Sequence, residues 1–335
     1  MTQENIRILL AARPVGHPRE SDFSIAHTPI PTPSDNQVLV QVHVLSLDPY
    51  MRGRMSDRPS YAAPVAIGEV MTGGAVGKVI ESRHPDFRPG DFVEGMLGWQ
   101  AYAMAEGSAL RKIDPELAPI STALGVLGMP GMTAYFGLLE IGQPKAGETV
   151  VVSGAAGAVG TLVGQIAKIA GCRVVGIVRG ADKAQYLRKL GFDAVVDYEA
   201  GLPSAQTLAT ACPDGVDVYF DNVGGELSDR VLQLINTRAR IVVCGQSSLY
   251  NAETPPTGPR MLGLLIVKQA RAEGFLAFQF AERWPQGMQQ MSQWIREDKL
   301  HYREDIVRGL ENAPKAFIEM LHGQHVGKRL VQIVP

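Results

Sequence analysis

One stretch of the chain decides the fold of its middle part: Val150-Val151-Val152-Ser153-Gly154-Ala155-Ala156-Gly157-Ala158-Val159-Gly160. Its apolar opening is typical of a short parallel strand that is buried on both faces. The spacing Gly154-x-x-Gly157-x-x-Gly160 is a variant of the dinucleotide-binding fingerprint, with its first glycine displaced by one residue. A helix-like period follows over residues 157–170. Together these features predict the strand, turn and helix that begin a nucleotide-binding βαβ unit.

Strand-like and helix-like segments continue to alternate after this stretch. We predict strands at 173–178, 194–196, 216–220 and 240–243, and helices at 182–190 and 226–235. Such alternation is typical of a doubly wound parallel sheet with helices on both faces. The sequence therefore predicts an α/β Rossmann domain over residues 126–301.

The two flanking regions have a different texture. In residues 1–125, short apolar runs at 38–44, 76–80 and 91–94 alternate with Gly/Pro turns, which is typical of a β-rich domain. Residues 302–335 add a predicted helix at 313–321 and a strand-like run at 327–334. That final strand suits a return of the chain to the first, β-rich region.

The glycine-rich turn predicts an anion site. Glycine lets a pyrophosphate approach the backbone, and the N-terminus of the next helix offers free N–H groups and a positive dipole end. About 20 residues further on, NAD enzymes carry an acidic residue for the ribose 2′-hydroxyl. Here Arg179 and Lys183 occupy that region, and such cations favour the 2′-phosphate of NADPH. Asp182 reads as the N-cap of the following helix, and the alternative for Lys183 is a solvated lysine in the first helical turn.

Composition excludes several classes of protein. The net charge of −2 over 335 residues, without a basic stripe, argues against nucleic acid or anionic membranes as partners. No apolar run approaches the roughly 20 residues that span a bilayer, and no signal peptide is visible. Cys172, Cys212 and Cys244 are scattered, which predicts a reducing, cytoplasmic location and no zinc site.

Six segments and a terminal pair carry a family resemblance that covers essentially the whole chain. They are Leu-Asp-Pro-Tyr-Met-Arg-Gly-Arg-Met at 47–55, Gly-Met-Pro-Gly-Met-Thr-Ala-Tyr-Phe-Gly-Leu at 128–138, the segments 154–168 and 187–191, Phe-Asp-Asn-Val-Gly-Gly at 220–225, Cys-Gly-Gln-Ser-Ser-Leu-Tyr-Asn at 244–251, and Gly-Lys at 327–328. With them the sequence resembles the zinc-independent medium-chain dehydrogenase/reductase superfamily. Within it, the chain is similar to the leukotriene B4 12-hydroxydehydrogenase/prostaglandin reductase family, which includes NADPH-dependent 2-alkenal and enone reductases.

The resemblance implies an architecture and a set of contacts. Residues 1–125 and 302–335 would form a GroES-like catalytic domain, and a homodimer would form through the Rossmann sheet edge near 261–267. The implied cofactor contacts are Gly157, Ala158, Val159 and Gly160 at the pyrophosphate; Lys183 and Tyr198 at the 2′-phosphate; Asn222, Cys244, Gly245, Gln246, Ser247, Tyr250, Phe275, Leu276 and Phe278 along the nicotinamide half; and Met129 and Thr133 at the carboxamide. His325 stands where the family usually has Asn before Gly-Lys, so it is either a cofactor contact or a surface histidine.

The resemblance also implies an activity: NADPH-dependent reduction of the carbon–carbon double bond of a small-molecule enal or enone. Tyr250 would then donate a hydrogen bond near the developing enolate, or only pack against the ribose. Tyr50 would line the substrate pocket, or serve as a core tyrosine. Among enzymes, the alternatives are an NADPH quinone oxidoreductase of the same superfamily and a dehydrogenase that oxidises an alcohol of a lipid mediator to a ketone. The alternative of another class is a non-catalytic NADPH-binding or RNA-binding protein.

Overall fold

The computed structural model describes residues 4–334, which divide into two compact units. One unit runs up to Gly125 and resumes at Glu304, and the other spans Val126–Arg303. The C-terminal segment therefore belongs to the same unit as the N-terminal segment. The assignment of catalysis to the first unit and of cofactor binding to the second stays a prediction.

A six-stranded parallel sheet forms the centre of the second unit, in the order β10-β9-β8-β11-β12-β13. The strands are β8 (Thr149–Ser153), β9 (Arg173–Val178), β10 (Ala194–Asp197), β11 (Val216–Asp221), β12 (Ile235–Val243) and β13 (Arg271–Gly274). The chain order reverses beside β8, and ligands of such sheets bind outside the carboxyl ends of the strands at this point. The predicted Rossmann arrangement is confirmed.

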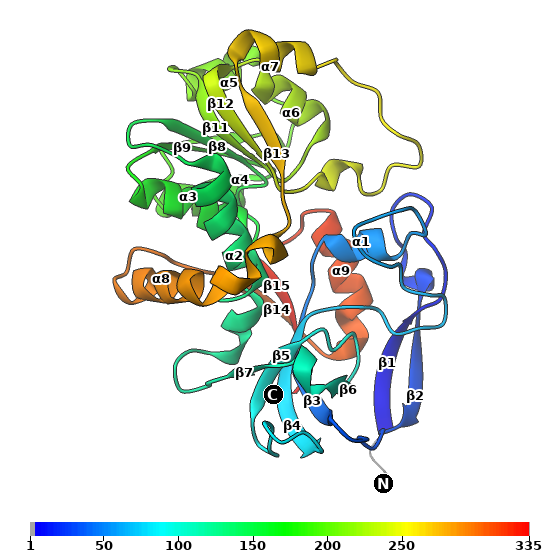
Figure 1. Ribbon diagram of the computed structural model, residues 1–335. Helices are drawn as coiled ribbons and strands as arrows, with labels where there is room; N and C mark the ends of the chain where they lie inside the picture. Colours follow the sequence, from blue (N-terminus) through cyan, green and yellow to red (C-terminus); the bar gives the residue numbers. More distant parts are fainter. Residues whose placement is uncertain (1–3, 335) are drawn as a thin grey trace. The chain divides into compact units, whose positions relative to one another are not determined.

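Helices cover both faces of this sheet (Figure 1). Successive side chains of one strand point to opposite faces, and those of β8 are buried on both. Val150 and Val152 belong to one apolar core, and Val151 belongs to another. The first core contains residues of α2 (Met129–Phe136), η4 (Gly137–Gly142), α3 (Gly160–Ile169), α4 (Ala181–Lys189) and α8 (Trp284–Arg296). The second contains residues of α5 (Ala205–Ala211) and α6 (Gly225–Leu232), and partly buried leucines of α7 (Leu262–Lys268) pack against it.

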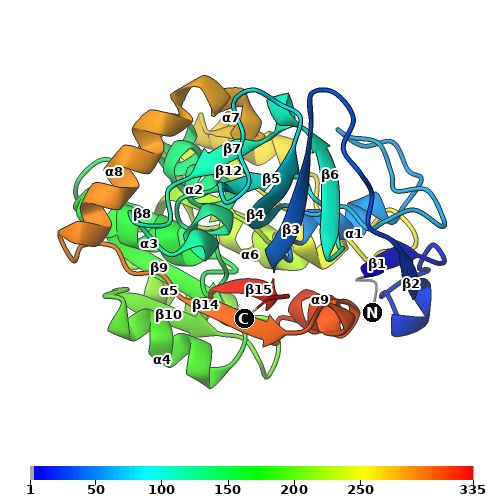
Figure 2. The same ribbon diagram turned by 90° about the horizontal axis from the view of Figure 1, so that it is seen from below.

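The first unit is β-rich, as predicted. One sheet has the order β14-β15-β3-β4-β5-β7 with β6 paired to β3, and β1 and β2 form a separate antiparallel pair. The elements are β1 (Glu4–Leu10), β2 (Phe23–Pro29), β3 (Gln37–Ser46), α1 (Tyr50–Arg54), β4 (Ala75–Ser82), β5 (Phe92–Gly95), β6 (Tyr102–Glu106), β7 (Arg111–Ile113), β14 (Glu304–Arg308), α9 (Ala313–Leu321) and β15 (Lys328–Gln332). β15 pairs antiparallel with β3, and Figure 2 shows it beside β14 and α9. The C-terminal strand thus returns to the first region of the chain.

Two predicted helix boundaries in the second unit are wrong. Helix α3 begins at Gly160 rather than at Gly157, because a turn that starts with Gly154 at a φ of +59° separates it from β8. Helix α6 ends at Leu232, whereas we predicted it to continue to Ile235. Ile235 instead begins β12, where it pairs with the first residue of β11.

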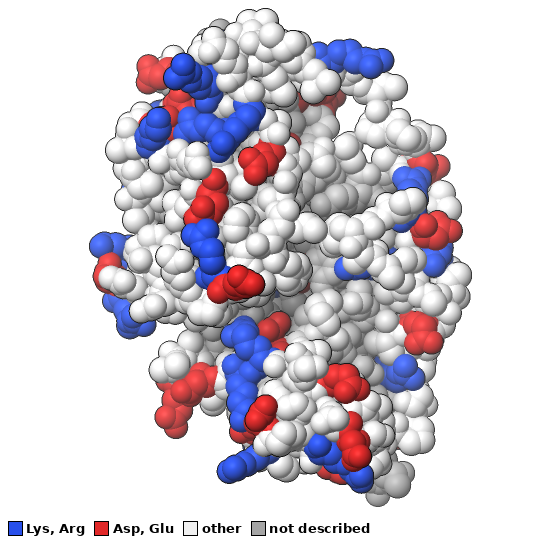
Figure 3. Space-filling view, in the orientation of Figure 1, with Lys and Arg blue, Asp and Glu red and all other residues white. Residues whose placement is uncertain are grey.

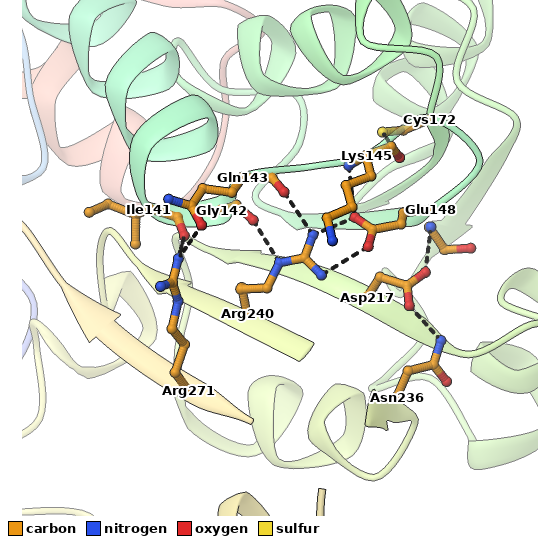
Figure 4. A network of polar contacts seen from close by, with 11 residues as sticks. Ile141, Gly142, Gln143, Lys145, Glu148, Cys172, Asp217, Asn236, Arg240 and Arg271 are labelled. Carbon is orange, nitrogen blue, oxygen red and sulfur yellow. Dashed lines mark hydrogen bonds and ion pairs between the residues drawn. The ribbon is translucent and has the colours of Figure 1, made fainter. Parts of the chain in front are cut away.

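Arginine side chains fix the amino ends of the strands in the second unit (Figure 4). Arg240 of β12 donates to the carbonyl oxygens of Gly142 at 2.8 Å and Gln143 at 3.0 Å, and it pairs with Glu148. The Arg240 side chain is only 14% exposed and that of Glu148 20%. Asp217, near the start of β11, accepts a hydrogen bond from the first amide of β8 at 2.8 Å. These contacts lie at the edge of the sheet opposite to its carboxyl ends.

Candidate functional site

The glycine-rich turn joins β8 to α3 in the second unit. The Gly157 amide donates to the Gly154 carbonyl oxygen at 3.1 Å, and Ala158 and Val159 complete the turn. A Cβ on Gly160 would lie 2.4 Å from the Gly154 carbonyl oxygen, so only glycine fits at the start of α3. No side chain caps this helix, which leaves its N-terminus and positive dipole end for an anion. The turn therefore has the geometry of a pyrophosphate site.

Three residues predicted for the adenosine end lie together after β9 and β10. The Arg179 guanidinium lies 5.1 Å from the centre of the Tyr198 ring. Burial, and next the charge of Arg179, lower the pKa of Lys183, while Glu199 opposes them. Arg179 is exposed and Lys183 is half-buried, and two neighbouring cations that repel each other gain from a doubly charged anion close to both. The arrangement fits the 2′-phosphate of NADPH.

The predicted N-cap role of Asp182 is wrong. Gly180 takes the N-cap position of α4 with a φ of +109°, a conformation that other residues rarely adopt. Asp182 lies instead in the first turn of α4, where its charge complements the helix dipole. Asp197, at the end of β10, accepts a hydrogen bond from the Gly180 amide at 2.8 Å and so fixes this turn.

The segment after β12 lies against the turn after β11. The Cys244 amide donates to the carbonyl oxygen of Asp221 at 2.9 Å, and the Ser247 amide donates to that of Asn222 at 3.2 Å. The Asn222 side-chain amide donates to the carbonyl oxygen of Ser153 at 2.8 Å. The structure thus brings residues predicted for the nicotinamide half together at the carboxyl ends of β8, β11 and β12.

Two side chains of this segment differ in what chemistry they offer. Burial, reinforced by the nearby Asp221 charge, raises the pKa of the Cys244 thiol to about 12, so this thiol stays protonated. The Tyr250 hydroxyl accepts a hydrogen bond from the Gln246 amide at 3.4 Å. A Cβ on Gly245 would lie 3.3 Å from that hydroxyl oxygen. A hydroxyl that accepts from an amide can donate its own proton to another acceptor.

The other residues predicted to contact the cofactor from the second unit differ in how exposed their side chains are. Within α2, the Thr133 hydroxyl donates to the carbonyl oxygen of Met129 at 2.7 Å. The Phe275 side chain is 9% exposed and packs in the core, so a contact with a ligand would involve its main chain. Leu276 and Phe278 are 40% and 60% exposed and can present their side chains.

Tyr50 and His325 belong to the first unit. Tyr50 begins α1, and burial raises the pKa of its hydroxyl. The Arg54 guanidinium lies 5.9 Å from the centre of the Tyr50 ring and 5.3 Å from that of Tyr61. The sequence analysis did not single out Arg54 or Tyr61, although both lie beside Tyr50. Arg54 lies in a segment that carried the family resemblance, whereas Tyr61 lies in an irregular loop without a signal. His325 lies between α9 and β15.

Residues 4–334 contain no group of three or more His, Cys, Asp or Glu that could hold a metal ion. Within the same part of the chain, no helix combines the length and the apolar character that crossing a bilayer requires.

Comparison with known proteins places the chain in a family. A family model described as "N-terminal domain of oxidoreductase" matches residues 7–113, and one described as "Zinc-binding dehydrogenase" matches residues 158–293. The chain is 50% identical over 337 residues to the NADPH-dependent curcumin reductase of Escherichia coli (strain K12), a match that covers 99% of this chain and 97% of the relative. It is 42% identical over 322 residues to prostaglandin reductase 1 of Rattus norvegicus, with 95% of each chain covered.

A solved structure is also similar over the whole length. The crystal structure of CurA in complex with NADPH from Vibrio vulnificus has a TM-score of 0.94 and 47% identity, and the match covers 98% of this chain and 99% of that chain. The resemblance stated from the sequence motifs is therefore confirmed. The chain belongs to the zinc-independent enone reductases of the medium-chain dehydrogenase/reductase superfamily, the family that includes the curcumin and prostaglandin reductases.

Proposed function

We propose that this protein uses NADPH to reduce the carbon–carbon double bond of α,β-unsaturated aldehydes or ketones. One observation carries the proposal. The glycine-rich turn, the cluster of Arg179, Lys183 and Tyr198, and the segment that ends at Tyr250 all follow strands at the carboxyl edge of one sheet. They do so in a chain that is 50% identical to an NADPH-dependent curcumin reductase.

Different residues of the chain bind the cofactor and stabilise the reacting substrate. The turn at Gly154–Gly160 holds the pyrophosphate, and Arg179 and Lys183 hold the 2′-phosphate. Bound NADPH supplies a hydride for the β-carbon of the substrate. Negative charge then grows on the carbonyl oxygen of the substrate, and preorganised hydrogen-bond donors stabilise such charge. The enolate takes up a proton from solvent at its α-carbon, which completes the saturated carbonyl product. We assign this donor role to Tyr250, whose hydroxyl is held by the Gln246 amide.

The substrate side of the proposal rests on the first unit. Tyr50 and Tyr61 flank the Arg54 guanidinium, which is also fixed by a hydrogen bond of 2.9 Å to the carbonyl oxygen of Ala63. Tyr61 is 59% exposed, so its ring can meet a ligand from solution. We assign this aromatic cluster to the apolar part of the substrate.

A single hydroxyl tests the reaction. Tyr250→Phe should lower kcat for a simple enone by about 100-fold, since removing one hydrogen-bond donor to a developing oxyanion costs about 10²–10³-fold. NADPH oxidation is followed by absorbance, and the saturated carbonyl product is identified by mass. Tyr186→Phe, which removes a hydroxyl from α4, is the control and should keep the wild-type kcat. Unchanged turnover in Tyr250→Phe contradicts the donor role, and higher kcat/KM with quinones than with enones would favour a quinone reductase.

We also propose a homodimer through the edge of the parallel sheet. β13 is the last strand of that sheet, and all four of its residues are exposed. In the neighbouring α7, Leu262, Ile266 and Val267 are 77%, 79% and 74% exposed. Unpaired strand edges and exposed apolar side chains are typical of an interface with another chain.

We further propose that the protein is cytoplasmic and does not bind nucleic acid. The three cysteines are free, which fits a reducing compartment. On the face drawn in Figure 3, Lys and Arg side chains are interspersed with Asp and Glu. That face therefore lacks the continuous basic track that a phosphate backbone requires.

A further inference from the structure

Asp221, at the end of β11, is a buried carboxylate surrounded by hydrogen-bond donors. It is 3% exposed, and none of the ion pairs formed within residues 4–334 involves it. Oδ1 accepts from Ser153 Oγ at 2.9 Å, Tyr219 OH at 2.9 Å, Val223 N at 3.0 Å and Gly224 N at 2.9 Å, and Oδ2 accepts from Ser228 Oγ at 2.7 Å and Gln246 Nε2 at 3.3 Å. A buried charge is tolerated when it accepts this many hydrogen bonds.

These contacts lead to the Tyr250 hydroxyl. The main-chain oxygen of Asp221 accepts from the amides of Cys244 and Gly245 at 2.9 and 3.0 Å. Its carboxylate holds the side chain of Gln246, whose main-chain amide donates to Tyr250 OH at 3.4 Å. Asp221 thus fixes three successive residues of the segment on which the tyrosine hydroxyl rests. The mechanism proposed above gives Asp221 no part.

We propose that Asp221 is a positioning residue that sets the Tyr250 hydroxyl for hydrogen-bond donation to the carbonyl oxygen of the substrate. It acts through Gln246 and not by contact with the reactants. The inference rests on the proposed function of Tyr250. Because a misplacement of about 1 Å can cost on the order of 100-fold in rate, holding this segment rigidly has a direct kinetic value.

The structure predicts how an amide at this position behaves. In Asp221→Asn the oxygen must remain on the Oδ1 side, because the main-chain amides of Val223 and Gly224 can only donate. The new NH₂ group then faces Gln246 Nε2, so a donor meets a donor. Turning the Gln246 amide to present its oxygen would break the bond of 3.0 Å from Nε2 to the Gly245 carbonyl oxygen, so the link is weakened in either orientation. We expect kcat with an enone to fall by about 10- to 100-fold.

Asp217→Asn is the matched control. Asp217 lies in the same strand near its other end, where it accepts from the Thr149 amide and the Asn236 side chain, both at 2.8 Å (Figure 4). The same chemical change there should leave kcat unchanged. An equal loss of kcat in both variants would show that Asp221 acts only through general stability and would overturn the positioning role.

A double-mutant cycle separates positioning from a merely structural effect. If Asp221 acts through Tyr250, Asp221→Asn should change kcat of the Tyr250→Phe protein by less than about twofold, since coupled residues are not additive. A full 10-fold or larger further loss, or no loss in the wild-type background, overturns the positioning role alone. Wild-type kcat in Tyr250→Phe itself overturns the proposed donor role and the positioning role together.

A second variant covers the case in which Asp221→Asn does not fold. Gln246→Met breaks the same link from its other end and leaves the remaining donors to Asp221 in place. It should lower kcat by a similar factor in the wild-type background and have little effect in Tyr250→Phe. If Gln246→Met keeps the wild-type kcat, the proposed link to Tyr250 is absent.

Discussion

Removing the charge of Lys183 tests the adenosine end of the site. A hydrogen bond to a charged group contributes about 1.5–3 kcal/mol, and the half-buried position of Lys183 places the expected loss at the lower end of that range. Because 1.4 kcal/mol corresponds to a factor of ten, Lys183→Ala should lower the preference for NADPH over NADH by about tenfold. The kcat/KM for NADH should not change, since NADH has no 2′-phosphate for Lys183 to bind.

The assay is the ratio of kcat/KM for NADPH and NADH with a single enone. Ionic strength must be held constant, because salt screens charge pairs of this kind. Lys189→Ala is the control, since Lys189 is an exposed lysine in the last turn of the same helix and should leave the ratio unchanged. An undiminished NADPH preference in Lys183→Ala would refute the assignment of Lys183 to the 2′-phosphate.

Three further changes probe the turn, the fold and the sheet edge. Gly160→Ala places a Cβ 2.4 Å from a carbonyl oxygen and should weaken NADPH binding at least about tenfold in a fluorescence titration. Gly263→Ala is the control, because its Cβ meets no atom within 4 Å. Equal NADPH affinities of the two variants would contradict the predicted anion site. Arg240→Met breaks a largely buried pair and should lower the free energy of unfolding in urea by about 3 kcal/mol. Arg283→Met, whose ion pair is exposed, should lower it by less than about 1 kcal/mol, and similar losses in the two variants would contradict the role of the arginine network. Ile266→Glu should convert a dimer to a monomer in sedimentation, and an unchanged mass would place the interface elsewhere.

The fold could be predicted where the local pattern was strong. The predicted strand at 173–178 and helix at 313–321 have the bounds of β9 and α9. Both carry apolar side chains that are buried, and burial imposes the periodicity that sequence reasoning uses. β13 was not predicted, because the short Arg271–Gly274 segment is exposed and lacks apolar alternation. It is a strand only because it pairs with β12.

The site was predictable in its residue types more than in its connections. Arg179 and Lys183 could be predicted to lie close together after the second strand of the βαβ unit, because that unit fixes their distance from the glycine-rich turn. The contact between Ser153 and Asp221 joins residues 68 positions apart, so no local pattern could indicate it. Helix α3 began later than predicted, because the helical period does not show where a glycine turn ends and the helix begins.

The fate of the transferred hydrogen is the most direct measure of the proposed reaction. NADPH that carries deuterium at the transferred position of the nicotinamide is incubated with the protein and an enone, and the product is analysed by NMR. We expect a saturated ketone with deuterium on the carbon β to the carbonyl group. An allylic alcohol with deuterium on the former carbonyl carbon would contradict double-bond reduction.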